Sequence, residues 1–125
     1  MAYNAPKTTT VISIPNISLT STGVQTLFTT AARFYPMTLL FELTSVSAFV
    51  TVATLSFGSN GGSFNNILAA SALTGVSSVN NILTFNLDLS VVSSIATSTA
   101  VGINVTVAAV ASTYTGKFII TGVYD

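Results

Sequence analysis

The sequence predicts an all-β protein, an antiparallel β-sandwich of about 8–9 strands that is jelly-roll-like by size, with an extended N-terminal arm. Short β-branched or alternating segments recur at intervals of roughly 8–15 residues, with Gly, Pro, Asn and Ser between them. No stretch has the periodicity of a long amphipathic helix. The length of 125 residues is that of one domain, so we expect an arm and first strand over residues 1–15 and the sandwich over residues 16–125.

The first part of the chain is a small, polar arm over residues 1–7, followed by strand-forming segments. β-Branched side chains dominate the segment after the arm, and they favour extended backbone. Pro15 and Asn16 are expected to end that first strand. The strands predicted in this part cover residues 8–14, 17–20 and 24–29.

A half-buried strand is predicted over residues 37–44. Leu39, Phe41 and Leu43 alternate with polar residues and so share one face of the strand. Leu40 is an exception, because it is apolar but falls on the polar face. The preceding residues 31–36, which include Phe34, Tyr35 and Pro36, are expected to form a connection.

A loop rich in Gly and Asn lies near the middle of the chain, after a strand predicted over residues 50–57. It lies within residues 57–68, and its residue types favour left-handed backbone and tight turns. Loops on a rigid β-scaffold commonly carry function. A phosphate-binding loop would need a following Gly-Lys-Ser/Thr and a helix, and neither is present, so a plain connection between strands is the better interpretation. A short strand over residues 64–68 and an irregular stretch over residues 69–75 are expected next.

The second half contains the cleanest strand pattern of the sequence, over residues 82–89. Leu83, Phe85, Leu87 and Leu89 alternate there with polar side chains. Residues 90–100 are expected to form a loop that could include a helical turn. A strand over residues 101–108 would place Val101, Ile103, Val105 and Val107 inward. The last strand, over residues 114–124, is expected to be interrupted by Gly116 and Gly122.

The most informative feature of the composition is the scarcity of charge. Half of the residues are hydrophobic, and only 5% are charged, with a net charge of zero. A soluble surface normally carries roughly 25–35% charged residues. Ser, Thr and Asn can coat a monomer, but they provide little electrostatic repulsion. We therefore expect much of the apolar surface to be covered by other chains.

The same composition argues against several classes of function. Three basic residues are too few for a nucleic-acid surface, so no nucleic-acid partner is expected. Cys and His are absent, which removes thiol catalysis and the commonest metal ligand and general base. The carboxylates Glu42, Asp88 and Asp125 are scattered, which does not favour a glycosidase pair or a calcium site. We expect no enzyme activity, no cofactor, no metal and no membrane partner.

Sugar recognition by exposed aromatic side chains is an alternative that the sequence leaves open. Most aromatics in a β-domain belong to the core, so any one of them is a weak candidate for a glycan platform. The aromatic candidates are Tyr3, Tyr35, Phe64, Tyr114 and Tyr124.

The order of the segments resembles the small β-sandwich proteins of tailed bacteriophages, notably the capsid decoration or cement proteins. The resemblance covers roughly residues 19–124. It lies in residues 19–28, 34–37, 55–60, 64–67, 73–75 and 103–107 and in the terminal strand from Gly116 to Tyr124. It implies a jelly-roll-like domain that forms trimers on the outer capsid surface and bridges subunits of the major capsid protein. Related domains occur in phage tails and fibres.

We therefore expect a structural virion protein on the outer surface of a phage capsid, homo-oligomeric and trimeric, that stabilises the shell by bridging its subunits. The alternative is a tail or fibre module that recognises a host-surface glycan. The arm and the strand after it are expected to contact neighbouring chains. In the Gly/Asn loop, Phe64, Asn65 and Asn66 are expected to pack and hydrogen-bond to a neighbour or to their own sheet. The interface candidates are Tyr3, Pro6, Lys7, Val11, Ile12, Asn60, Phe64, Asn65 and Asn66.

Overall fold

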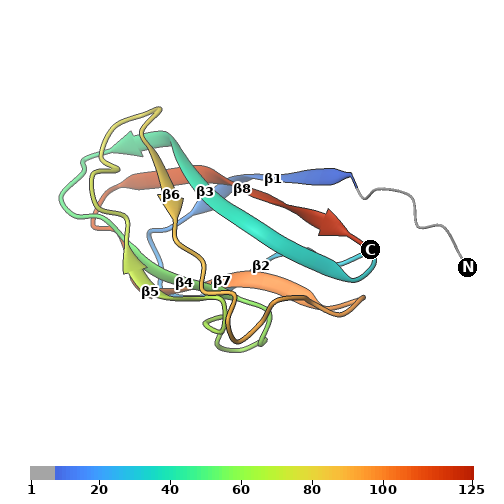
Figure 1. The fold of residues 1–125 in the computed structure, drawn as a ribbon. Coiled ribbons are helices and arrows are strands. Elements are labelled where there is room, and N and C mark those ends of the chain that lie inside the picture. Colours follow the sequence, from blue (N-terminus) through green and yellow to red (C-terminus); the bar gives the residue numbers. More distant parts are fainter. Residues whose placement is uncertain (1–7) are drawn as a thin grey trace, which may run out of the picture.

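The computed structural model describes residues 8–125, which form eight β-strands and no helix. The strands lie in two four-stranded antiparallel sheets that pack face to face (Figure 1). The first sheet has the order β1-β8-β3-β6 and the second has the order β2-β7-β4-β5. The bounds are β1 Thr9–Ser18, β2 Gly23–Thr29, β3 Phe34–Ser47, β4 Thr54–Gly58, β5 Leu68–Ala72, β6 Ile82–Phe85, β7 Ala100–Val107 and β8 Thr113–Tyr124.

The pairing of the strands is that of a jelly roll. β1 pairs with β8, β2 with β7, β3 with β6 and β4 with β5, so the chain resembles one long hairpin that has been rolled up. The pairs β3/β8 and β4/β7 then join these hairpin layers into the two sheets. The predicted all-β antiparallel sandwich is confirmed, and this strand order agrees with the jelly-roll form of it.

Two predicted strand boundaries in the first part of the chain are wrong. β1 continues through Pro15 and Asn16, because its pairing with β8 shifts there in a bulge and Asn16 takes a positive φ of 60°. β1 is an edge strand, where a proline costs no ladder hydrogen bond. β3 starts at Phe34, within the segment expected to be a connection. Its pairing with β8 shifts in a bulge just after Pro36, which lets the strand accommodate the proline.

The second half also departs from the predicted boundaries. β4 begins only at Thr54, and β5 occupies residues that were expected to be irregular. β6 ends at Phe85, although the side chains over residues 86–89 keep their alternating burial. β8 is continuous through its two glycines. Pairing with a neighbouring strand, which alternation does not encode, decides where each of these strands ends.

The core lies between the two sheets and is built from the alternating residues named in the sequence. Leu39, Phe41 and Leu43 are fully buried, as are Val101 and Ile103. Val107, expected inward, is 55% exposed because it ends β7 at the edge of the sandwich. The fully buried Tyr114 stacks on Phe41 with ring centroids 6.3 Å apart and an interplanar angle of 6°.

Gly116 and Gly122 leave room on the inward face of β8 for aromatic rings of β3. A Cβ at Gly116 would lie 2.4 Å from Cζ of Phe41, and one at Gly122 would lie 2.3 Å from Cζ of Phe34. Glycine inside a strand commonly marks such a close approach. The two residues that were expected to interrupt the last strand therefore allow it to pack.

Candidate interaction surfaces

The chain's own Gly/Asn loop covers part of the outer face of the second sheet, over β4 and β7. Phe64 at the end of this loop is 2% exposed and lies over Gly102 of β7, where a Cβ would come within 2.8 Å of the Phe64 ring. Ser56, on the outer side of β4, donates a hydrogen bond to the carbonyl of Ser63 at 3.5 Å. Figure 1 shows the loop running back beneath β4 and β7. The loop thus covers the sheet around Ser56 and Gly102, while Val24 on β2 stays exposed.

Asn60 holds the loop together. Its Oδ1 accepts hydrogen bonds from the backbone N–H groups of Asn65 at 2.9 Å and Asn66 at 3.3 Å, while its Nδ2 donates to Oδ1 of Asn65 at 2.7 Å. The Asn66 side chain bonds to Ser59 through both of its polar atoms. Asn side chains replace backbone partners in turns in this way. The polar groups of the loop are therefore largely satisfied within the loop itself.

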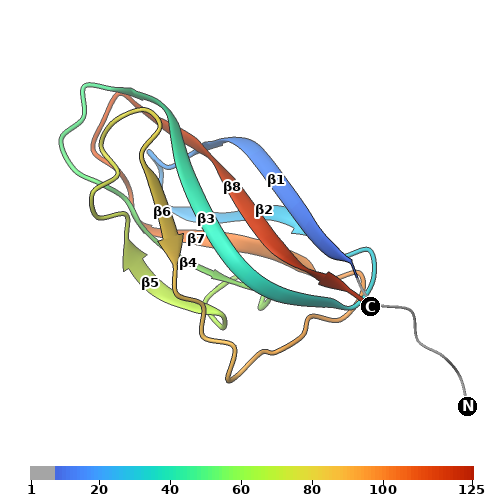
Figure 2. The ribbon, with the colours of Figure 1, turned by 45° about the horizontal axis from the view of Figure 1, so that its top comes forward.

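Within residues 8–125, no loop covers the outer face of the first sheet in a comparable way. We call it the open face; β1, β8, β3 and β6 lie side by side in it (Figure 2). Four of its apolar side chains are exposed and three more are half-buried, and threonines fill the space among them. The open face consists of Val11, Tyr35, Met37, Thr38, Leu40, Glu42, Ile82, Thr84, Lys117, Ile119, Thr121 and Val123.

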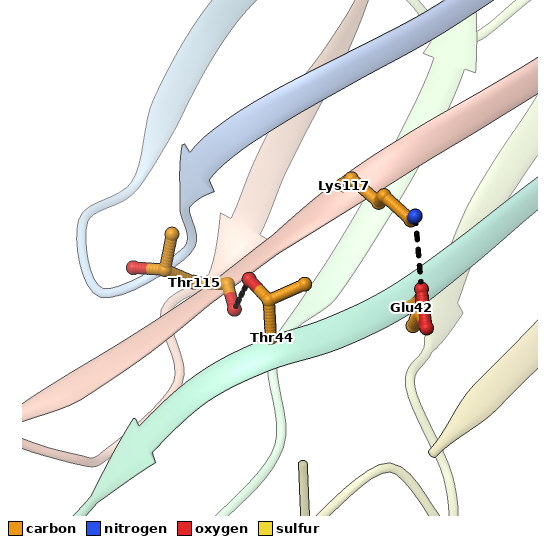
Figure 3. Close-up of polar contacts among 4 residues, drawn as sticks. All are labelled: Glu42, Thr44, Thr115 and Lys117. Carbon is orange, nitrogen blue, oxygen red and sulfur yellow. Dashed lines mark hydrogen bonds and ion pairs between the residues drawn. The ribbon is translucent and has the colours of Figure 1, made fainter. Parts of the chain in front are cut away.

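One ion pair lies near the middle of the open face. Nζ of Lys117 on β8 is 3.2 Å from Oε1 of Glu42, its cross-strand partner on β3 (Figure 3). Thr44 donates a hydrogen bond to the carbonyl of Thr115 at 3.1 Å on the same strand pair. Further along, the hydroxyls of Thr38 and Thr121 hydrogen-bond to each other. The polar groups drawn in Figure 3 are thus matched in pairs between β3 and β8.

The carboxylates have local partners in residues 8–125. Glu42 pairs with Lys117, and Asp88 accepts hydrogen bonds from Ser90 through both the hydroxyl at 2.6 Å and the backbone N–H at 3.0 Å. These bonds lower the pKa of Asp88 below its usual 3.8. In the described part of the chain, no group of three or more carboxylates could hold a metal, and no pocket is present. No helix among residues 8–125 is long and apolar enough to span a membrane.

The predicted interface residues fall in three places. Tyr3, Pro6 and Lys7 lie outside the described residues. Val11 is exposed on the open face, whereas the neighbouring Ile12 points inward and packs against the core.

The loop candidates of the predicted interface also divide. Asn60 and Asn65 are exposed, and Asn66 is half-buried. Phe64 is buried against the chain's own β7, so of its two expected partners it packs on its own sheet in the described residues.

Burial also removes most aromatic candidates for sugar binding. Tyr114 is fully buried, and Tyr124 packs against Phe34 with ring centroids 4.9 Å apart. With Phe64 also buried, Tyr35 is the one exposed aromatic candidate within residues 8–125. A single tyrosine on a flat sheet gives the glycan interpretation little support.

Sequence reasoning missed most of the open face. Ile119, Val123 and Met37 were not recognised as surface residues, because the pattern alone does not tell which face of a sheet meets solvent. Leu40 was the available signal: an apolar residue on the polar face of an otherwise regular strand. In the structure it is half-buried beside Ile119.

Two phage capsid structures contain chains with this fold. A chain of the cyanophage Pam1 capsid asymmetric unit superposes with a TM-score of 0.62 at 18% identity, covering 100% of this chain and 94% of that one. A chain of the capsid of Ralstonia phage GP4 gives a TM-score of 0.63 at 15% identity, covering 96% of this chain and 85% of that one. At such identities the likeness establishes a common fold. No protein-family model and no curated protein matches the sequence.

Proposed function

We propose that this chain is a structural protein of a phage particle, which decorates the outer surface of the capsid and stabilises it by bridging subunits of the major capsid protein. The observation that carries the proposal is the whole-length match to chains of two phage capsids. Because the match covers most of both partners, each capsid chain is little more than this one domain. A small domain of this kind suits an accessory component of the particle.

The surface of the molecule supports a role in assembly. Residues 8–125 contain five charged side chains, and the exposed apolar residues include four on the open face. Isolated exposed apolar residues are ordinary, but a contiguous group of them marks an interaction surface. A protein that binds only the assembled shell stabilises it by mass action, and many identical copies multiply a modest contact. Such a role requires no catalytic group.

Self-association is the second part of the proposal. A nearly uncharged surface gives weak repulsion between copies, which favours contact of the chain with itself. The resemblance to decoration proteins implies three copies, a number that the mass of the native protein measures directly.

The capsid role is tested by adding the purified protein to particles that lack it. We expect the protein to sediment with the particles at a saturable, fixed ratio, and to raise the temperature at which the shells open. Deleting residues 1–7 is expected to weaken attachment while leaving the described strand pairs in place, since β1 begins at Thr9. Absence of saturable binding would overturn the capsid role, and unchanged affinity of the truncated protein would overturn the contact by the arm.

A further inference from the structure

The two outer faces of the sandwich differ in a way that points to a self-contact. The loop through Phe64 packs on part of the outer face of the second sheet, whereas within residues 8–125 the open face of the first sheet keeps four apolar side chains exposed. We propose that two copies of the chain pair through their open faces, about a two-fold axis that runs parallel to β3 and β8 and midway between them. This rests on the proposed self-association, not on capsid attachment, and it makes the solution unit a dimer in place of the trimer implied by the resemblance.

The area of the open face fits a specific pair. β1, β3 and β8 each run for ten residues or more, and β6 adds four. With about 3.4 Å per residue and about 4.8 Å between strands, these lengths give roughly 650 Å² of flat area per copy. Side-chain relief adds to this, and the smaller specific interfaces bury about 600 Å² per partner. Two sheets pack face to face at about 10 Å separation, so the open faces can meet without a change in the fold.

The ion pair selects the direction of the axis. An axis perpendicular to the strands through the Glu42–Lys117 row would place Lys117 over the second copy's Lys117 and Glu42 over its Glu42. An axis parallel to β3 and β8 exchanges the two strands and places Lys117 over the second copy's Glu42. Opposite charges then meet both within and between copies, and no charge is buried without a partner. Charge complementarity therefore favours the parallel axis.

The same axis also places apolar residues of one copy opposite apolar residues of the other. Leu40 is the cross-strand partner of Ile119, and Tyr35 is the partner of Val123. Exchange of β3 and β8 brings each of these residues opposite its own partner from the second copy, so apolar pairs stack on apolar pairs. A two-fold contact requires such a self-complementary surface. The register of one strand pair thus supplies both the apolar and the charged complementarity.

The test measures the mass of the protein in buffer, without particles, by analytical ultracentrifugation over a range of concentrations. We expect a monomer–dimer equilibrium for the wild type. Ile119→Asp should weaken dimerisation by more than about tenfold, because it places an unpaired carboxylate at the centre of the contact. Val24→Asp is the matched control, since Val24 is an exposed valine on β2 of the other sheet, and it should dimerise like the wild type. A monomeric or trimeric wild type, or equal effects of the two variants, would overturn the pairing.

A charge-exchange pair of variants keeps the test decisive if Ile119→Asp does not fold. Glu42→Lys alone should weaken dimerisation, and Glu42→Lys combined with Lys117→Glu should restore it. If Glu42→Lys alone dimerised as strongly as the wild type, the proposed stacking would be ruled out. The particle assay tests the capsid role separately. A dimer that fails to bind shells would support the pairing and overturn the capsid role. A monomer that binds shells would overturn the pairing and support the capsid role.

Discussion

Tyr114 joins the last strand to a loop on the far side of the core, and its removal should show how much that link stabilises the fold. Its hydroxyl donates a 2.5 Å hydrogen bond to the carbonyl of Val76, in the connection between β5 and β6. Both residues are buried. Its ring also stacks on Phe49, with centroids 6.0 Å apart. Tyr114→Phe keeps the stacking and removes only the hydrogen bond.

The expected cost of Tyr114→Phe at neutral pH is about 1–3 kcal/mol of unfolding free energy, because the buried carbonyl of Val76 loses its partner. Burial raises the pKa of Tyr114 to about 12, from an ordinary value of 10.0. Below pH 10 both folded and unfolded states hold the proton, so the contribution is complete. Between about pH 10 and 12 the unfolded tyrosine releases its proton while the folded one keeps it, so stability falls as pH rises. The Phe variant lacks this part of the alkaline loss.

Urea unfolding followed by circular dichroism, at pH 7 and in steps from pH 9 to about pH 12, measures both effects. The wild-type and Tyr114→Phe curves should differ at pH 7 and converge toward alkaline pH. Equal stability at pH 7 would show that the hydrogen bond contributes nothing. Parallel loss of stability in both proteins above pH 10 would refute the assigned role of burial.

Three further changes test other contacts. Gly116→Ala places a Cβ 2.3 Å from the carbonyl oxygen of Glu42 and should cost about 1–3 kcal/mol, whereas Gly61→Ala, with nothing within 4 Å of the new Cβ, should stay within about 0.5 kcal/mol in the same urea assay. Asn60→Ala removes three hydrogen bonds from the Gly/Asn loop and should lower the unfolding free energy by about 1–2 kcal/mol, while Asn86→Ala on the exposed side of its segment should have little effect. Ser90→Ala should raise the pKa of Asp88 toward 3.8 in an NMR titration, and an unchanged pKa would contradict the hydroxyl contact.

The inward faces of the main strands could be predicted from the sequence, because burial on one side of a strand imposes an alternation of apolar and polar residues. Leu39, Phe41 and Leu43 were assigned correctly in this way, as were Val101, Ile103 and Val105. The ends of strands were predicted less well. Pro15 fits a strand because β1 lies at the edge of its sheet, and Gly116 fits one because the ring of Phe41 packs over it. Neither can be recognised from the sequence, which does not show the neighbouring strand.

The interaction surface was harder to predict. Phe64 was expected to pack on a neighbour or on its own sheet, and the sequence could not decide between them, because its contact with Gly102 joins residues far apart in the sequence. The open face combines residues of four strands that are distant in the chain, and only the register of β3 with β8 brings Leu40 beside Ile119. The scarcity of charge indicated that some surface is covered by other chains, but composition does not identify which face it is.

The most direct test of the capsid role is quantitative co-sedimentation of the wild-type protein with phage shells that lack it. The capsid role predicts saturable binding of the wild type at a fixed ratio to the major capsid protein, together with greater resistance of the shells to heat. Binding that never saturates, or shells whose heat resistance does not change at full occupancy, would contradict it.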